Sequence, residues 1–93
     1  MTKLKDKKLK QTEGLNVTLQ NIIVEDNAFE CSLYVDGEYA FEIYNMDLCG
    51  SHSYDVINHK LWHKVLDFIG EKENTDQSIK ILDKIINNEL GLV

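Results

Sequence analysis

Apolar and polar residues alternate most regularly between positions 28 and 45 of this chain. A period of two is typical of a β-strand with one buried face and one face in water. Asp36 and Gly37, which favour tight turns, divide the stretch into two strands. The pattern therefore predicts a β-hairpin. Its expected inward-facing residues are Phe29, Cys31 and Leu33 on the first strand and Tyr39, Phe41 and Ile43 on the second.

The length of the turn decides which residues of the hairpin pair. A two-residue loop would set Cys31 opposite Glu42 and mix apolar with charged side chains on both faces. A three-residue loop of residues 35–37, with Gly37 in the left-handed position of a G1 bulge, avoids this mixing. We expect the three-residue loop, because a one-residue slip turns the whole apolar set of a strand to the wrong face. The expected pairs are Leu33 with Tyr39, Cys31 with Phe41, and Phe29 with Ile43.

The opposite face of the hairpin carries the candidate partner-binding residues, which are Glu30, Tyr34, Glu42 and Tyr44. In the expected register Glu30 and Glu42 are direct cross-strand neighbours, and like charges in that position destabilise a sheet. One interpretation is an ordinary solvated face. The other is an acidic, tyrosine-bearing surface for a basic partner, since departures from local rules concentrate at functional sites.

Residues 15–24 are predicted to form a strand before the hairpin. Their apolar phase changes after Leu19. The change indicates either a bulge at Gln20 and Asn21, which would restore the inward face, or a strand in which Ile23 points inward.

Two helices are predicted after the hairpin. The first begins at Ser53 or Asp55 and ends at Gly70, and the second runs from Thr75 to Gly91. Residues 46–53 are expected to form the loop that leads into the first helix.

This order of elements predicts the α+β class: a three-stranded antiparallel β-meander followed by two α-helices packed on one face. Residues 1–14 are expected to form a lysine-rich tail outside the single domain of residues 15–93. In such a meander the strand of residues 39–45 is an edge, and it contains neither proline nor lysine. We therefore expect it to pair with a second copy, giving a homodimer, or with a strand of a partner.

The charge of the chain is uneven. The 93 residues carry a net charge of −6, and all ten basic residues are lysines. Residues 1–10 hold five lysines against one aspartate, about +4, which leaves about −10 for the remainder. Such a field attracts basic protein surfaces and repels nucleic acid, and without arginine the bidentate reading of bases is absent. We expect a protein partner with a basic surface and no sequence-specific nucleic-acid binding.

The apolar runs and the cysteines bear on the compartment. No apolar run is long enough to span a membrane, and the lysine-rich start lacks the apolar segment of a secretory signal. Cys31 and Cys49, without such a signal, are typical of a reduced protein rather than a disulfide scaffold. We expect a cytoplasmic protein that does not contact membranes.

Four side chains recur every fourth residue along the first predicted helix: Asp55, His59, His63 and Asp67. Two histidines at this spacing can bind one zinc ion, and Cys49 and His52 upstream could add ligands. Lys60, however, stands where the metalloprotease motif HExxH has its glutamate. Solvated histidines beside aspartates are the commoner arrangement. We therefore predict no metal and no cofactor, with His59 and His63 as the candidate ligands if a metal binds.

One part of the chain resembles a known domain. The first hairpin strand ends in Tyr34-Val35-Asp36-Gly37, and Asn45, Gly50 and Tyr54 follow. In this succession residues 29–54 resemble an uncharacterised small domain of phage and bacterial proteins, in which a YxDG hairpin precedes a glycine-containing loop. The loop of that family is richer in glycine than residues 46–49 are here. The resemblance implies no particular activity. The abundance of lysine, asparagine and isoleucine without arginine or proline also resembles the coding of AT-rich phages and mobile elements.

The chain contains no nucleophile elbow and no glycine-rich phosphate loop. The predicted function is that of a small acidic binding protein without enzymatic activity, encoded by a phage or mobile element, that inhibits or adapts a host protein such as a defence factor. Two alternatives stay open. One is a nucleic-acid mimic whose carboxylates imitate phosphates, and the other is a small metal-dependent enzyme that uses His59 and His63.

Overall fold

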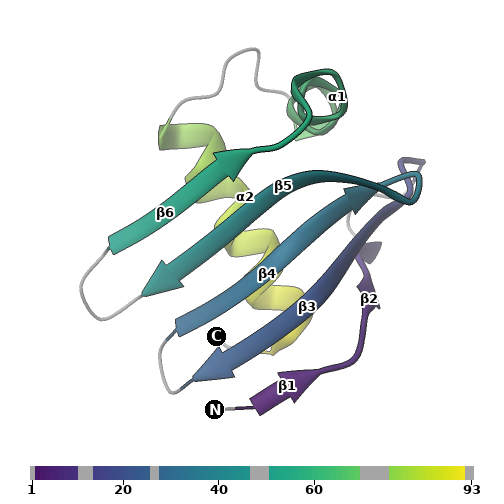
Figure 1. Ribbon diagram of the computed structural model, residues 1–93. Helices are drawn as coiled ribbons and strands as arrows, with labels where there is room; N and C mark the ends of the chain where they lie inside the picture. The colour runs from purple at the N-terminus through teal and green to yellow at the C-terminus, as the bar shows by residue number, and fades with distance from the viewer. Residues whose placement is uncertain (1, 11–13, 26–27, 47–50, 70–75, 92–93) are drawn as a thin grey trace.

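The computed structural model describes residues 2–10, 14–25, 28–46, 51–69 and 76–91 of the chain. These residues form one antiparallel sheet and two helices (Figure 1). The strands are β1 (Thr2–Leu4), β2 (Lys7–Lys8), β3 (Val17–Glu25), β4 (Ala28–Val35), β5 (Glu38–Met46) and β6 (Ser51–Val56), and the helices are α1 (His59–Ile69) and α2 (Asp76–Leu90).

The sheet has the order β1-β3-β4-β5-β6, and β2 pairs with β3 beside β1. Both helices pack against one face of this sheet, and α2 runs behind its central strands (Figure 1). The predicted α+β class is confirmed. The predicted number of three strands is wrong, because the described residues form six.

The core lies between the sheet and the helices. Phe41 of β5 stacks on Trp62 of α1, with ring centroids 4.0 Å apart and ring planes 6° apart. The apolar face predicted for the hairpin is buried as expected at Phe29, Cys31, Leu33, Phe41 and Ile43. The helices contribute a complementary set of buried residues: Leu61, Trp62, Val65, Leu66, Ile79, Leu82 and Ile86.

The hairpin of β4 and β5 turns through two residues, so the predicted three-residue loop is wrong. Asp36 and Gly37 both have positive φ angles, 52° and 82°, as a type I′ turn requires. The extra residue that keeps the apolar face in phase is Ala40, where the register shifts inside the strands. The extra residue lies at Ala40 instead of in the turn, so the predicted residues of β4 and the later part of β5 still face the core. The observed pairs are Leu33 with Phe41 and Cys31 with Ile43.

Strand β3 contains the bulge predicted at Gln20 and Asn21. The register with β4 shifts between Gln20 and Ile23, and Asn21 has a φ of 52°. Asparagine tolerates this left-handed conformation better than most residues. The bulge buries Ile22 completely, so of the two alternatives it is Ile22 and not Ile23 that points into the core.

The N-terminal segment differs from the predicted tail. Strand β1 pairs with β3 from Thr2 opposite Val24 to Leu4 opposite Ile22. Strand β2 pairs with the earlier part of β3, where Lys7 lies opposite Leu19. The side chain of Leu9 is only 1% exposed, and its N–H donates to the carbonyl of Val17 at 2.9 Å. Exposed lysines here mark a protected sheet edge rather than a solvated tail.

The segment after β5 also differs from the prediction. Residues 47–50 of the predicted loop lie outside the described residues. Residues 51–53 of that loop and the predicted helix start belong to β6, which pairs with β5 from Phe41 opposite Val56 to Met46 opposite Ser51. Strand β5 therefore has neighbours on both sides. The prediction that residues 39–45 form a free edge is wrong, so neither a second copy nor a partner's strand can pair with the chain there.

Helix α1 begins after Asn58 and not at Ser53 or Asp55, which both lie in β6. The side-chain Oδ1 of Asn58 accepts a hydrogen bond from the N–H of Leu61 at 3.2 Å, as an N-cap does. The predicted end at Gly70 and the predicted start of the second helix at Thr75 lie outside the described residues. Helix α2 ends before Gly91, which has the positive φ of a C-terminal cap as predicted. Neither described helix combines the length and apolar character that crossing a bilayer demands.

Candidate partner-binding face

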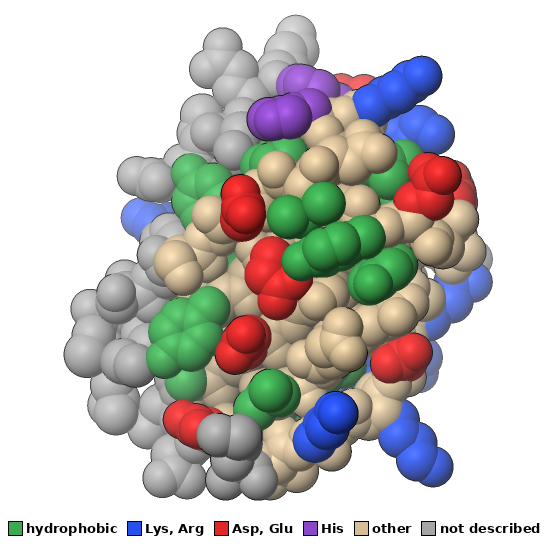
Figure 2. Space-filling view, viewed as in Figure 1, with side chains coloured by type: hydrophobic (Ala, Val, Ile, Leu, Met, Phe, Trp, Pro, Cys, Tyr) green, Lys and Arg blue, Asp and Glu red, His purple; other side chains and the backbone are tan. Residues whose placement is uncertain are grey.

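The face of the sheet opposite the helices is covered by no described element (Figure 2). We call it the open face. Strand phase and register assign the open face the following side chains: Thr18, Gln20, Ile23 and Glu25 on β3, Glu30, Ser32 and Tyr34 on β4, Tyr39, Glu42 and Tyr44 on β5, and Ser53 and Asp55 on β6. All four predicted partner-binding residues, Glu30, Tyr34, Glu42 and Tyr44, thus lie on one surface.

The neighbours of the two glutamates differ from the predicted ones. Glu30 lies opposite Tyr44, and Glu42 lies opposite Ser32 on one side and Asp55 on the other. The two-residue turn and the bulge at Ala40 together are the cause, since each moves the later residues of β5 by one position along β4. The direct pair of like charges on this face is therefore Glu42 with Asp55, not Glu30 with Glu42.

Four carboxylates cross the open face in an oblique line, which we call the acidic diagonal: Glu25, Glu30, Glu42 and Asp55. Glu25 is opposite Ala28, two residues before Glu30, and Glu30 is opposite Tyr44, two residues after Glu42. Each of these two steps is a diagonal neighbour, about 7–8 Å, and the last step is a direct pair at about 5 Å. Figure 2 shows acidic side chains in such an oblique line across this face.

A chain of hydrogen bonds holds the centre of the diagonal in place. Glu42 Oε2 accepts a hydrogen bond from the Ser32 hydroxyl at 2.8 Å and another from the Tyr39 hydroxyl. The amide Nδ2 of Asn21 donates in turn to Ser32 Oγ at 3.4 Å. This arrangement depends on both bulges. The bulge in β3 brings Asn21 beside Ser32, and the bulge at Ala40 places Tyr39 on the same face as Glu42. The carboxylate of Glu42 is therefore oriented before any partner arrives.

Tyr39 is the aromatic residue most affected by this network. Its hydrogen bond to the Glu42 carboxylate, together with partial desolvation and the charge of Glu42, raises the pKa of Tyr39 to about 12. Its ring stacks on that of Tyr34, with centroids 5.3 Å apart and planes 20° apart. Since Tyr39 is 37% exposed, the pair offers a rigid apolar surface with polar tips beside the acidic diagonal.

The open face is short of positive charge. Lys3 of β1 lies opposite Ile23 at the far edge, and Lys8 of β2 lies opposite Thr18. Lysine side chains stand at the rim of this view and not among the central acidic groups (Figure 2). Within the described part of the chain, the structure records no ion pair for Glu30, Glu42 or Asp55. Their charges are therefore available to a basic group from outside.

The histidine candidates do not form a metal centre in the described part of the chain. His59 and His63 are exposed on α1, and no group of three potential ligands among the described residues could hold an ion. Asp55, predicted to share their helix, lies instead in β6. Cys49 and the side chain of His52 lie outside the described residues.

Cys31 does not offer a reactive thiol. It is fully buried on the core face, where desolvation, followed by the charges of Glu42, Asp83 and Glu30, raises its pKa to about 12. The thiolate is the nucleophilic form of cysteine, so the buried Cys31 thiol is a poor nucleophile in the folded protein.

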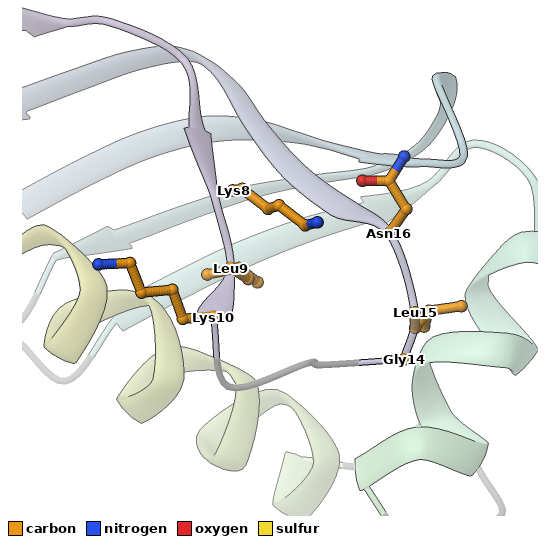
Figure 3. A pocket seen from close by; sticks show the side chains of 6 residues that line it. All are labelled: Lys8, Leu9, Lys10, Gly14, Leu15 and Asn16. Atoms are coloured by element: carbon orange, nitrogen blue, oxygen red, sulfur yellow. The ribbon is translucent and has the colours of Figure 1, made fainter.

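A hollow of about 550 Å³ lies where the chain turns from β2 into β3. Its described lining includes Lys8, Leu9, Leu15 and Asn16 (Figure 3). The Lys8 amine points toward Asn16, whereas the side chain of Lys10 leads away toward α2 (Figure 3). Of the two lysines that line the hollow, only Lys8 extends across it toward a second polar side chain. We assign no ligand to this hollow.

The sequence alone did not identify three residues of the site. Tyr39 was expected in the core and Asp55 on the first helix, whereas Ser32 was expected on the non-core face of the hairpin but without a role. The signal for Tyr39 was the Asp36-Gly37 dipeptide, whose preference for a two-residue type I′ turn reverses the phase of Tyr39. Asp55 and Ser32 gain their roles only from the cross-strand register.

Comparison of the chain with protein-family models, curated proteins and solved structures gives no match. The functional argument therefore depends on the chemistry of the open face.

Proposed function

We propose that this chain is a small acidic binding protein without enzymatic activity, which docks a basic surface of another protein on its open face. Placed in a phage or mobile element, it would act in the cytoplasm by inhibiting or adapting a host protein such as a defence factor. The observation that carries the proposal is the acidic diagonal beside the stacked Tyr34 and Tyr39.

The chemistry of this face supports protein binding in two ways. Aromatic residues anchor interfaces because they bury rigid apolar area at a small entropic cost. Carboxylates without basic neighbours steer a positively charged partner, and a lysine or arginine placed between Glu42 and Asp55 relieves their mutual repulsion. Because Glu42 is already held by Ser32 and Tyr39, little ordering is left to be done on binding.

A second candidate is a nucleic-acid mimic, which is a narrower form of the same activity. It is favoured by the regular line of four carboxylates, which offers a row of negative charge to a phosphate-binding surface. In that case the partner is a nucleic-acid-binding protein, and DNA or RNA competes with this chain for it. The metal-dependent alternative has no comparable support, since the described residues supply only His59 and His63.

Affinity capture with matched baits tests the proposal. The wild-type protein and the variant Glu30→Gln with Glu42→Gln are immobilised and exposed to the same bacterial lysate. A control variant, Glu38→Gln with Asp67→Asn, removes two charges away from the acidic diagonal. We expect one or more basic proteins to be retained by wild type and control and to be depleted about tenfold on the first variant. Equal retention on all three baits would contradict the proposal.

A further inference from the structure

The open face constrains the shape of what can bind to it. Strands β3, β4 and β5 each pair with a strand on both sides, so their backbone N–H and C=O groups are already used. An extended segment laid on this face would find no backbone partners, and buried unpaired backbone groups are costly. A helix satisfies its own backbone hydrogen bonds and can lie on a sheet face without that cost. The same sheet already accepts α1 and α2 on its other face in this way (Figure 1).

Apolar groups flank the acidic diagonal on both sides. The stacked Tyr34 and Tyr39 lie on one side of it, at the end of the sheet near the hairpin turn. Tyr44 lies on the other side, at a shallow hollow of about 160 Å³ that it lines together with Ile23, Glu25 and Glu30. Ile23, opposite Glu30 on β3, lies on the same side of the diagonal as the two stacked tyrosines. The surface therefore presents a charged line between two apolar areas.

This order of charge and apolar area matches an amphipathic basic helix. Along one side of a helix, residues four apart are separated by about 6 Å and residues three apart by about 4.5 Å. The steps of the acidic diagonal, about 7–8 Å twice and then about 5 Å, lie within the reach of lysine and arginine side chains at such positions. Apolar residues beside that basic row would contact Ile23 and the stacked tyrosines on one flank and Tyr44 on the other.

We infer that the occupant of the open face is an amphipathic helix of the partner protein, laid along the acidic diagonal, with lysine or arginine at i, i+4, i+8 and i+11. The inference rests on the proposed function, because it specifies the partner's shape at the same surface. The partner helix would form a third layer on the sheet, on the face opposite to α1 and α2 of this chain.

Three synthetic peptides of about 18 residues, long enough for five helical turns, test the inference. The first carries four arginines at the stated spacing with leucines beside them. The second has the same composition with the arginines distributed around the helix. The third is the first with a central alanine changed to proline, which breaks the helix without altering charge. Fluorescence anisotropy gives the affinity of each, and circular dichroism gives the helicity of the bound peptide.

We expect the first peptide to bind at least tenfold more tightly than the other two and to gain helicity on binding. The variant Glu30→Gln with Glu42→Gln should weaken that binding about tenfold, and Glu38→Gln with Asp67→Asn should not. Equal affinity for all three peptides, or no binding of any, would overturn the helical occupant. If the captured partner still requires Glu30 and Glu42 in that case, the proposed function stands; if it does not, the proposed function fails too.

Discussion

Glu42 of β5 and Asp55 of β6 face each other directly across the outermost strand pair of the open face. Glu42 has two hydroxyl donors, and the structure records no ion pair between either carboxylate and a described basic side chain. Like charges in this position cost a sheet about 0.2–1 kcal/mol. The folded protein thus carries a local destabilisation, which a basic group placed between the two carboxylates would remove.

Replacing Asp55 by asparagine should therefore raise stability and weaken binding at once. We expect Asp55→Asn to increase the free energy of unfolding by about 0.2–1 kcal/mol, measured by urea denaturation. Binding to the captured partner should weaken and lose part of its salt dependence. Asp67→Asn, an exposed change on α1, is the control for net charge. A destabilised Asp55→Asn protein with unchanged binding would count against a functional role for this pair.

The titration of Tyr39 tests the hydrogen bond to Glu42. The pKa of this phenol is raised from its ordinary 10 to about 12, so ionisation of the hydroxyl is opposed by the neighbouring carboxylate. The stabilisation from this contact is complete below pH 10 and is lost as the pH rises through about 12. The difference in ultraviolet absorbance between wild type and Tyr39→Phe isolates this titration. We expect Glu42→Gln to lower the midpoint toward 10, and an unchanged midpoint would show that Glu42 is not the cause.

The aromatic stack at the core should carry much of the stability. Phe41 is fully buried between Trp62 at 4.0 Å and Tyr54 at 5.9 Å, measured between ring centroids. Truncation of a buried phenylalanine to alanine costs about 3–5 kcal/mol. We expect Phe41→Ala to lower the urea midpoint accordingly, with Phe41→Leu much milder. An unchanged urea midpoint would mean that the side chain of Phe41 does not face the core.

The N-terminal segment should contribute to stability as part of the sheet. Leu9 is 1% exposed and joins the core beside β3. We expect Leu9→Ala to cost about 2–5 kcal/mol in thermal or urea unfolding, the range for a buried leucine. Lys5→Ala, an exposed neighbour, is the control. If Leu9→Ala and Lys5→Ala unfold alike, the segment behaves as the tail that its lysines first indicated.

The buried side of the hairpin could be predicted from the sequence, and its exact pairing could not. Alternation assigns Cys31, Leu33 and Phe41 to the core in either register, since moving a bulge by whole pairs keeps their phase. The two-residue turn has a local signal in Asp36-Gly37, but the bulge at Ala40 has none. Ala40 is fully buried, and its carbonyl accepts hydrogen bonds from the N–H groups of Ile57 and Asn58. These contacts belong to the tertiary structure and are not visible in the local pattern.

The outer strands of the sheet, β6 on one side and β1 and β2 on the other, could not be predicted from the sequence, for different reasons. Strand β6 reads SHSYDV, with apolar side chains only at Tyr54 and Val56, and Tyr54 also fits the apolar side of a helix that includes Ile57. Strands β1 and β2 are short and lysine-rich, as protected edges are, and too brief for a period of two to be recognised. The candidate site was predicted better than these strands because its residues come from the hairpin itself.

Transfer of magnetisation from the captured partner to the backbone amides of this chain tests the central claim most directly. In a cross-saturation experiment, the account predicts that signal loss is concentrated on the strands of the open face, strongest at Glu30, Tyr39 and Glu42. The amides of α1 and α2 should keep their intensity. Signal loss centred on α1 and α2, or on the lysines of β1 and β2, with Glu30 and Glu42 unaffected, would contradict the assignment of the open face as the binding surface.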